Sequence, residues 1–177
     1  MRKLWLALTD ARIRAALGAL DRCGPALGDL AGHPELAADF FSPLRQKLAK
    51  AAASRGKRPG AGTALAAAEN FARRLEKTFS DMALLEARPE ALPQALAFLQ
   101  RACALAPRLL AEEGAQKTLE ELRGLCASGR KVLAQAKLAA DAGPGEFTEN
   151  LKFSTIYSGL DAAFDAFERC AETLTRL

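Results

Sequence analysis

Hydrophobic residues recur every three or four positions along most of the chain, and short segments rich in Pro and Gly separate these runs. Such spacing is typical of amphipathic helices, which bury one apolar face, while Pro and Gly mark the places where helices end. We expect Gly24-Pro25 to kink or interrupt the first helix, Ser42-Pro43 to bend or restart the second, and Thr63 to cap the third. The pattern predicts six helices, over residues 2–31, 35–54, 64–87, 90–112, 115–141 and 147–176.

The composition supports helices and argues against sheets. The chain of 177 residues contains 39 Ala and 29 Leu, but one Val and two Ile. Ala and Leu are among the best helix formers, whereas β-branched residues favour strands. Six amphipathic helices with short connections can bury their apolar faces only against one another. The sequence therefore predicts an all-α fold, a six-helix bundle forming a single domain over residues 1–177.

Charge divides this bundle into two halves. Residues 1–88 carry 15 Lys and Arg against 9 Asp and Glu, whereas residues 89–177 carry 10 against 12. The division falls between the third and fourth predicted helices, so it separates two groups of three helices, over residues 1–88 and 89–177. A formal net charge of +4 is too small to indicate a nucleic-acid-binding protein unless the charge is concentrated on one surface.

Motifs for enzymatic chemistry are missing from the sequence. The four cysteines are far apart and the chain has one histidine, His33, so a zinc finger or ribbon is excluded. No nucleophile stands beside His33, and no glycine-rich segment continues into a phosphate-binding loop. We therefore expect a non-enzymatic protein. Each cysteine lies in an Ala- and Leu-rich stretch and is expected to be a small buried apolar residue: Cys23, Cys103, Cys126 and Cys170.

Targeting and membrane-spanning segments are also not predicted. The apolar run near the start has only five residues, which is too short for the central part of a signal peptide. No uncharged stretch approaches the roughly 18 residues that a membrane span needs. The sequence thus favours a cytoplasmic protein, with at most a peripheral contact at the inner face of the membrane.

Four carboxylates form a second stripe on the last predicted helix, separate from its apolar face. Asp161, Asp165, Glu168 and Glu172 are spaced by four, three and four residues, so they share one side of the helix. Like charges at this spacing repel one another. Two explanations remain open for this acidic stripe: solvent together with the neighbouring Arg169 and Arg176, or a cation, because hard metal ions prefer clustered oxygen ligands.

The same helix resembles the closing helix of PhoU-like proteins, of the type found beside low-affinity phosphate permeases. The resemblance is carried by Lys152-Phe153-Ser154-Thr155-Ile156-Tyr157, followed by Asp161-Ala162-Ala163-Phe164-Asp165 and Glu168. It implies two three-helix repeats, no enzymatic activity, and a cytoplasmic accessory or regulator of phosphate transport whose partner is a membrane permease. It also implies Asp161 and Asp165 as ligands of a divalent or iron cation, and leaves open whether the chain forms a homodimer.

Elsewhere the chain departs from the acidic motifs of that family. The third predicted helix has Glu69 followed by Arg73, which we expect to form an ion pair four residues apart. The fifth has no acid between Leu125 and Arg130. Because a metal cluster needs ligands from several helices, the resemblance implies a reduced or lost metal site here.

A basic segment supports an alternative function. Residues 45–58 contain six Lys and Arg, and no Asp or Glu occurs between positions 43 and 68. Such a segment could bind an anionic surface, nucleic acid or lipid, through Arg55, Lys57 and Arg58. Nucleic acid is the less expected partner, because the segment has no aromatic residue for base stacking. The other interpretation is a solvated helix end whose cations suit the helix dipole.

Overall fold

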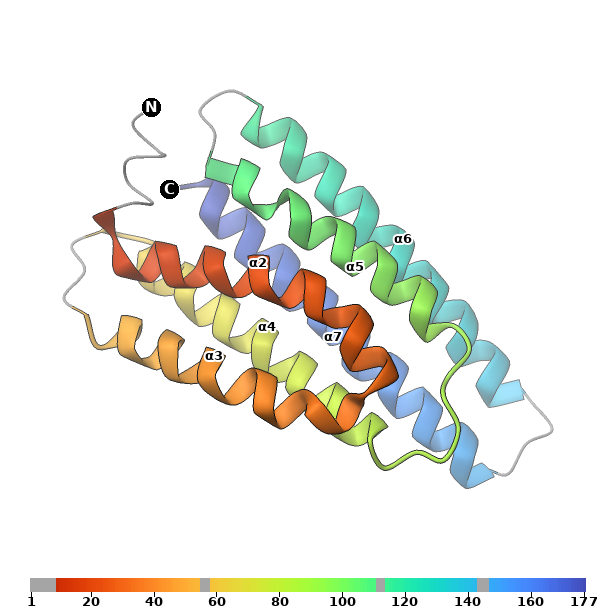
Figure 1. Cartoon of the computed structure of the whole chain (residues 1–177). Helices are drawn as coiled ribbons and strands as arrows, with labels where there is room; N and C mark the ends of the chain where they lie inside the picture. Colours follow the sequence, from red (N-terminus) through yellow and green to blue (C-terminus); the bar gives the residue numbers. More distant parts are fainter. Residues whose placement is uncertain (1–8, 55–57, 111–113, 143–146) are drawn as a thin grey trace.

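The computed structural model describes residues 9–54, 58–110, 114–142 and 147–177, and all regular elements in this part of the chain are helical (Figure 1). This confirms the predicted all-α class and the six helical segments. Two short 3-10 helices accompany the six longer helices, η1 after α2 and η2 after α5. The elements are α2 (Ala11–Gly32), η1 (Pro34–Leu36), α3 (Ala37–Ala52), α4 (Ala61–Met82), α5 (Leu92–Leu105), η2 (Ala106–Leu110), α6 (Ala115–Ala142) and α7 (Phe147–Thr175).

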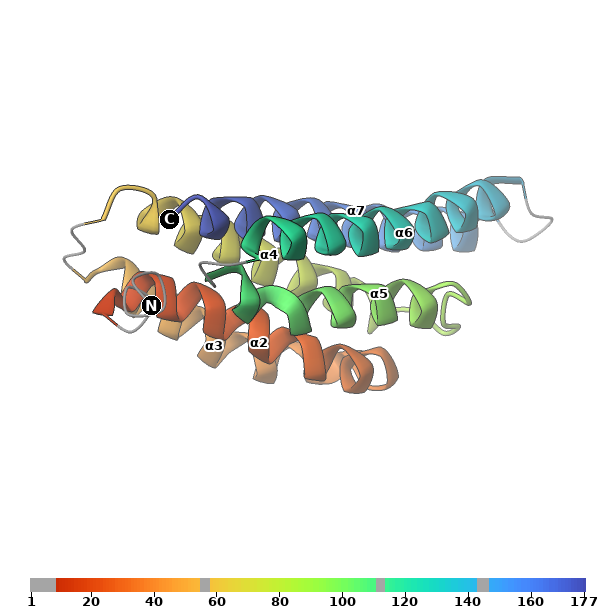
Figure 2. The same cartoon turned by 90° about the horizontal axis from the view of Figure 1, so that it is seen from above.

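The helices pack in two layers. In one layer α7 lies between α4 and α6, and in the other α2 lies between α3 and α5. Contacts of α4 with α2 and α3, and of α6 with α5, join the layers. Figure 2 shows α6 and α7 on the side opposite α2 and α3, and shows the α6–α7 hairpin extending past the other helices at one end. That the two groups of three helices are repeats of one another stays a prediction.

The apolar faces predicted from the sequence meet in one core. The α4 face buries Phe71, Leu75 and Phe79 completely, and α7 contributes Phe164 and Phe167. The rings of Phe71 and Phe167 have centroids 5.3 Å apart, which is a favourable aromatic contact between the two most extensively paired helices. Each such side chain contributes roughly 1.5–3 kcal/mol through burial. The core therefore holds α4 and α7 firmly at the centre of the bundle.

Proline interrupts neither α2 nor α3. The α2 helix continues through Gly24 and Pro25, and α3 continues through Pro43, so an interruption or restart at these positions is wrong, while a kink or bend there stays a prediction. A Cβ at Gly24 would lie 2.9 Å from the Cβ of Cys103, which shows that α2 and α5 approach closely there. Packing along the whole length of the helix outweighs the one hydrogen bond that Pro25 removes.

The cap of α4 also differs from the prediction. The helix begins at Ala61, and its N-cap is Gly60 rather than Thr63. Gly60 has φ of +85°, a conformation that glycine adopts without strain. Thr63 consequently lies inside the first turn, where its side chain cannot cap the helix.

The beginning of α2 is tied to the segment that precedes α4. The Asp10 carboxylate accepts a hydrogen bond from the Arg12 backbone N–H at 2.9 Å and pairs with the Arg12 guanidinium at 3.2 Å. Arg12 Nη2 also donates to the Arg58 carbonyl at 3.3 Å. Burial raises the pKa of Asp10, but the hydrogen bonds from Arg12 outweigh burial and lower the pKa overall.

The cysteines lie in the core, as expected from the sequence. All four cysteines are free and buried, which confirms their expected role as small apolar residues of the core. Among the helices of the described ranges, none combines the length and the hydrophobicity that a bilayer crossing demands.

Candidate functional site

The acidic stripe of α7 faces two arginines of α6. Arg130 donates through Nη1 to Asp165 and through Nη2 to Glu168 Oε2, the latter at 2.6 Å. Seven residues earlier on α6, Arg123 Nη2 donates to Glu172 Oε1 at 2.5 Å, and its Nε lies 3.7 Å from Glu168 Oε1. Because residues seven apart on a helix share one face, the two arginines and the three carboxylates form a continuous row, called here the ion-pair ladder.

Electrostatics keep both arginines charged. Burial would lower the pKa of Arg130, but the neighbouring Glu168 and Asp165 carboxylates outweigh it and raise the pKa. The hydrogen bond with Glu172 raises the pKa of Arg123. The ladder is half-exposed, so its strength is reduced by solvent screening. It nevertheless supplies a countercharge to three of the four carboxylates of the acidic stripe.

Asp161 lies outside the ladder. Burial, and then repulsion from Asp165, raise its pKa, although Arg130 and Lys137 partly oppose the shift. Asp161 lines a hollow of about 170 Å³ together with Lys137 and Ser158. The Lys137 ammonium donates to the Ser158 hydroxyl at 3.1 Å. Among the described contacts, Asp161 is therefore the carboxylate of the stripe that forms no ion pair with an arginine.

The two predicted metal ligands thus have different surroundings. Asp165 is bound by Arg130, whereas Asp161 lines the small hollow. Within the described ranges, no group of three or more His, Cys, Asp or Glu is placed to hold a metal ion. Arg130 stands in the part of α6 where the family resemblance would place an acidic motif. The countercharge was expected from Arg169, Arg176 or a cation, but it comes mainly from α6, with Arg176 4.0 Å from Glu172.

The basic segment is only partly described. Arg45 pairs with Glu76 of α4 at 3.1 Å, so it is engaged within the bundle. Arg55 and Lys57 lie outside the described residues, and the Arg58 carbonyl accepts the hydrogen bond from Arg12. Binding of an anionic surface through Arg55, Lys57 and Arg58 stays a prediction.

Arg73 and His33 each contact a neighbouring side chain on the surface. Arg73 Nη2 donates to Asn70 Oδ1 at 3.1 Å, so the expected pair with Glu69 is replaced by a contact within one turn. His33 Nδ1 lies 3.2 Å from Glu35 Oε1 on the surface, where both side chains are exposed. Neither contact has the geometry of a catalytic site.

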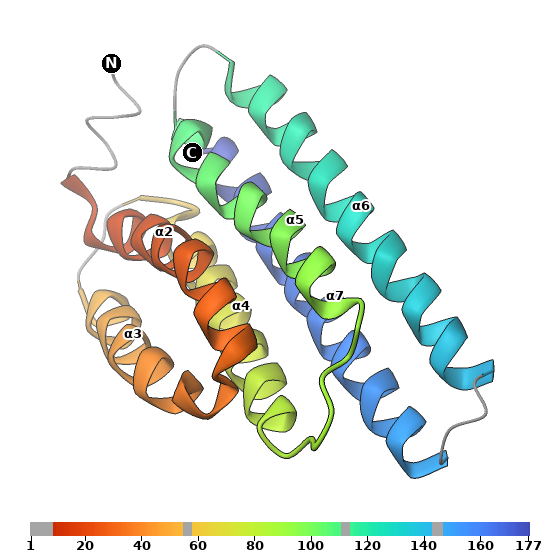
Figure 3. The same cartoon turned by 45° about the vertical axis from the view of Figure 1, so that its right-hand side comes forward.

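A larger cavity opens at the end of the bundle where the α6–α7 hairpin extends past the other helices. It measures about 570 Å³ and is bordered by α6, by the first turns of α7 and by the connection from α4 to α5. Figure 3 shows how these three segments are arranged at this end of the bundle. We call it the end cleft. Its lining consists of Ala87, Arg88, Glu90, Ala91, Ala136, Ala139, Ala140, Glu149, Phe153 and Tyr157.

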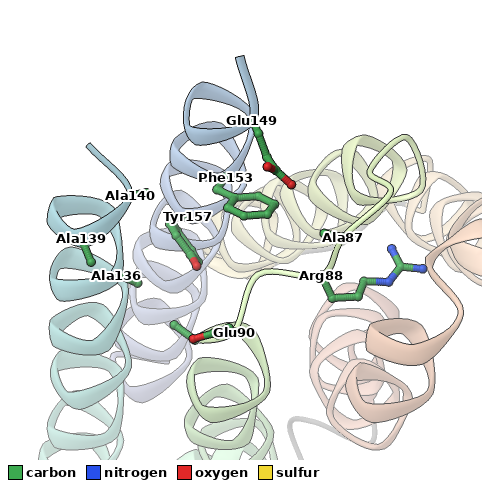
Figure 4. A pocket seen from close by; sticks show the side chains of 10 residues that line it. Ala87, Arg88, Glu90, Ala136, Ala139, Ala140, Glu149, Phe153 and Tyr157 are labelled. Atoms are coloured by element: carbon green, nitrogen blue, oxygen red, sulfur yellow. The ribbon is translucent and has the colours of Figure 1, made fainter. Parts of the chain in front are cut away.

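Aromatic and acidic side chains surround the end cleft (Figure 4). Phe153 and Tyr157 are four residues apart on α7, so they share one face, with Glu149 one turn before them. Tyr157 is only 5% exposed. Burial raises its pKa; a hydrogen bond with the Ala91 backbone opposes this shift, and the nearby Glu90 carboxylate adds to it. Glu90 thus approaches the tyrosine from the opposite wall.

The one arginine in the lining does not neutralise these acids. In Figure 4 the Arg88 side chain runs away from Tyr157 and Glu90. Its Nη1 donates to the Met82 carbonyl at 2.9 Å, and its charge acts on Glu35 near the end of α2. The end cleft therefore combines apolar walls with carboxylates.

Sequence reasoning missed both the ion-pair ladder and the end cleft. The spacing of Arg123 and Arg130 was a usable signal, because residues seven apart fall on one helix face. Phe153 and Tyr157 belong to the segment of α7 that resembles PhoU-like proteins, but they line a cleft only because the α4–α5 connection lies beside them.

Comparison of the chain with protein-family models, with curated protein sequences and with solved structures finds no match.

Proposed function

We propose that the protein is a non-enzymatic accessory or regulator of phosphate transport and acts by contact with a membrane permease. The sequence support is the resemblance of α7 to the closing helix of PhoU-like proteins. The structural observation that carries the proposal is the bundle of six long helices in the described part of the chain, the number that two three-helix repeats require. The contact of Arg130 with Asp165 and Glu168 bears on the metal site alone. Where that family would use cations between acidic helices, this chain has an internal cation, so its acidic stripe stabilises the bundle.

Helix contacts support the two repeats that the resemblance implies. If α2, α3 and α4 correspond to α5, α6 and α7, the contact of α2 with α3 corresponds to that of α5 with α6. Likewise the contact of α3 with α4 corresponds to that of α6 with α7, and α2–α5 and α4–α7 join the halves. The α2–α4 contact is matched only in part, because α7 contacts η2, which follows α5, more than it contacts α5 itself. We infer that the chain consists of two three-helix repeats.

The proposed function is tested by isolating the partner. A tagged chain, expressed in its own host, is recovered from detergent-solubilised membranes and its partners are identified by mass spectrometry. We expect a phosphate permease, and we expect deletion of the gene to change the rate of uptake of labelled phosphate. Recovery of no permease, together with unchanged uptake, would refute the proposal.

Metal binding is tested separately. Protein purified without chelator is analysed for metals, and its melting temperature is measured with Fe²⁺, Zn²⁺ and Mn²⁺. Because Arg130 occupies Asp165 and Glu168, we expect no response from the natural chain. Arg130→Asp removes that cation and adds a carboxylate from a second helix, so we expect it to gain stability from a divalent ion. A response of the natural chain that Asp165→Asn abolishes would show that the stripe still binds metal.

A further inference from the structure

We infer that the end cleft is the docking site for a Lys- or Arg-bearing cytoplasmic segment of the partner permease. The inference rests on the proposed function for the identity of the partner. The binding chemistry itself, an extended cationic side chain entering an apolar and acidic cleft, depends only on the residues that line the cleft.

The walls suit an aliphatic stem. Ala136, Ala139 and Ala140 of α6 line the cleft together with the rings of Phe153 and Tyr157 of α7. Lys and Arg side chains bury their methylene groups against such apolar surfaces and keep the charged head in a polar environment. The cavity of about 570 Å³ can hold several side chains.

The charges in the end cleft select a cation. Glu90 and Glu149 are exposed carboxylates on opposite sides of the cleft, with the aromatic rings between them. A cation at this position would interact with carboxylates and with the faces of aromatic rings. Arg88 does not compete for these carboxylates, because its guanidinium donates to the Met82 carbonyl. In a chain whose formal net charge is +4, the cleft is thus a local acidic site.

The neighbouring hollow continues this charge pattern. It measures about 210 Å³ and contains Glu86 and Glu149 together with one cation, Lys152. Among the described residues that line the two hollows, three are carboxylates, Glu86, Glu90 and Glu149, and two are cations, Lys152 and the outward-turned Arg88. The surface therefore attracts a segment with more than one positive charge.

These properties favour a membrane protein's loop over the membrane itself. Cytoplasmic loops of membrane proteins carry an excess of Lys and Arg, and segments next to the bilayer also carry apolar residues. Anionic lipid headgroups, in contrast, would be repelled by Glu90 and Glu149. Charge complementarity thus points to a protein segment as the occupant.

The site is tested with a defined probe, a fluorescently labelled helical peptide of Leu, Ala and Lys, whose binding to the full chain is followed by anisotropy. The comparison peptide has Glu in place of every Lys. The variant Glu90→Gln/Glu149→Gln removes the two carboxylates of the cleft. Its matched control, Glu69→Gln/Glu121→Gln, makes the same change in net charge at exposed positions of α4 and α6. Ala139→Trp fills the cleft without altering charge.

We expect the Lys peptide to bind and the Glu peptide not to bind. The cleft variant and Ala139→Trp should each weaken binding by about tenfold or more, while the control variant should not. Equal weakening by the control, or unchanged binding in both cleft variants, would overturn the inference. Binding of the natural chain to vesicles of anionic phospholipid, lost in the cleft variants, would also overturn it by identifying lipid as the occupant.

The two proposals fail in different ways. If the Lys peptide binds in the cleft but no phosphate permease is recovered from membranes, the docking chemistry holds and the assigned partner is wrong. If a permease is recovered equally well with the natural chain and with Glu90→Gln/Glu149→Gln, the proposed function holds and the end cleft is not the docking site.

Discussion

Gly129 of α6 lies against the ring of Phe164 of α7, so closely that a Cβ at position 129 would be 2.3 Å from the ring Cζ. Both residues are buried, and the ring fills the space that the missing side chain leaves. The two helices approach more closely here than any other residue at position 129 would allow. This contact lies one position before Arg130, so the ring and the ion-pair ladder occupy the same part of the helix pair.

Gly129→Ala should therefore destabilise the protein. Overpacking a close helix contact typically costs about 1–3 kcal/mol. Gly124→Ala is the matched control on the same helix, because a Cβ at Gly124 would meet nothing within 4 Å. We expect that variant to gain up to about 1 kcal/mol from helix propensity. Urea denaturation followed by circular dichroism measures both; equal effects of the two substitutions would contradict the close contact.

The neighbouring aspartates of the acidic stripe should respond in opposite directions to the same substitution. The pKa of Asp161 is raised in the folded protein, so its ionised form is penalised relative to the unfolded chain. Asp161→Asn should add a few tenths to about 1 kcal/mol at neutral pH. The gain should vanish once the pH falls below the ordinary pKa of 3.8, where the carboxyl group is protonated in both states. Asp165→Asn removes a partner of Arg130 and should lose about 0.5–1 kcal/mol.

Melting temperatures at neutral and acidic pH distinguish these cases. If both substitutions destabilise the protein equally at neutral pH, Asp161 has a stabilising partner that the described contacts do not include. If neither has an effect, solvent screens the ion-pair ladder completely.

The buried thiols should make the fold sensitive to alkali. Burial raises the pKa of Cys23, Cys126 and Cys170 from 9.0 to about 12. Above pH 9 the thiols ionise in the unfolded chain but not in the folded protein, so stability should fall as the pH rises toward 12. Each thiol contributes about 1.4 kcal/mol of this loss at about pH 10.

The pH dependence of unfolding in Cys23→Ala and Cys170→Ala provides the measurement. Each variant should lose less stability than the natural chain between about pH 8 and pH 10, whatever its stability at neutral pH. If the free energy of unfolding depends on pH in the variants as it does in the natural chain, the thiols titrate alike in the folded and unfolded states. In the natural chain, a thiol-specific reagent should react at the rate of unfolding.

Removing the Asp10 cap of α2 should lower the stability of the protein measurably. Asp10→Ala removes the acceptor for the Arg12 backbone N–H and for its guanidinium, and should cost about 1–2 kcal/mol. Because the pKa of Asp10 is lowered, the stabilisation is present above the ordinary value of 3.8 and disappears as the pH falls through the lowered pKa. Thermal unfolding of the natural chain and of Asp10→Ala should thus converge in acid; a constant difference would contradict a charged cap.

Helix positions were predictable because they depend on local sequence. Apolar spacing and the Gly-Pro segments placed most helix bounds within about five residues of those observed. The first helix is an exception, because α2 begins at Ala11 after the extended Asp10, where one helix from residue 2 was predicted. The errors occurred where packing outweighed a local preference. Gly24-Pro25 predicts a kink or an interruption, but α2 continues through it and packs closely against Cys103 of α5. Thr63 is a good capping residue, but Gly60 adopts the conformation that starts α4 earlier.

The site was less predictable because it depends on which helices become neighbours. The acidic stripe could be read from α7 alone, yet its arginine partners lie 35 to 49 residues earlier in the chain. No local rule connects Arg123 with Glu172. The end cleft likewise needs three segments, and its main acid, Glu90, stands in a connection that carries no motif.

The ion-pair ladder leaves open how far α7 can slide along α6. A shift of α7 by one helical turn, about 5.4 Å, would place Arg130 opposite Asp161 and Asp165 instead of Asp165 and Glu168, so attraction alone does not fix the axial register. The same shift would move the ring of Phe164 from Gly129 to Leu125 and Cys126, whose side chains leave no such space for it. The fit of the Phe164 ring against Gly129 therefore fixes the axial register of α7 along α6, which the ion pairs alone do not fix. A helix pair with such a ladder but no glycine opposite a ring would be free to change its alignment by one turn.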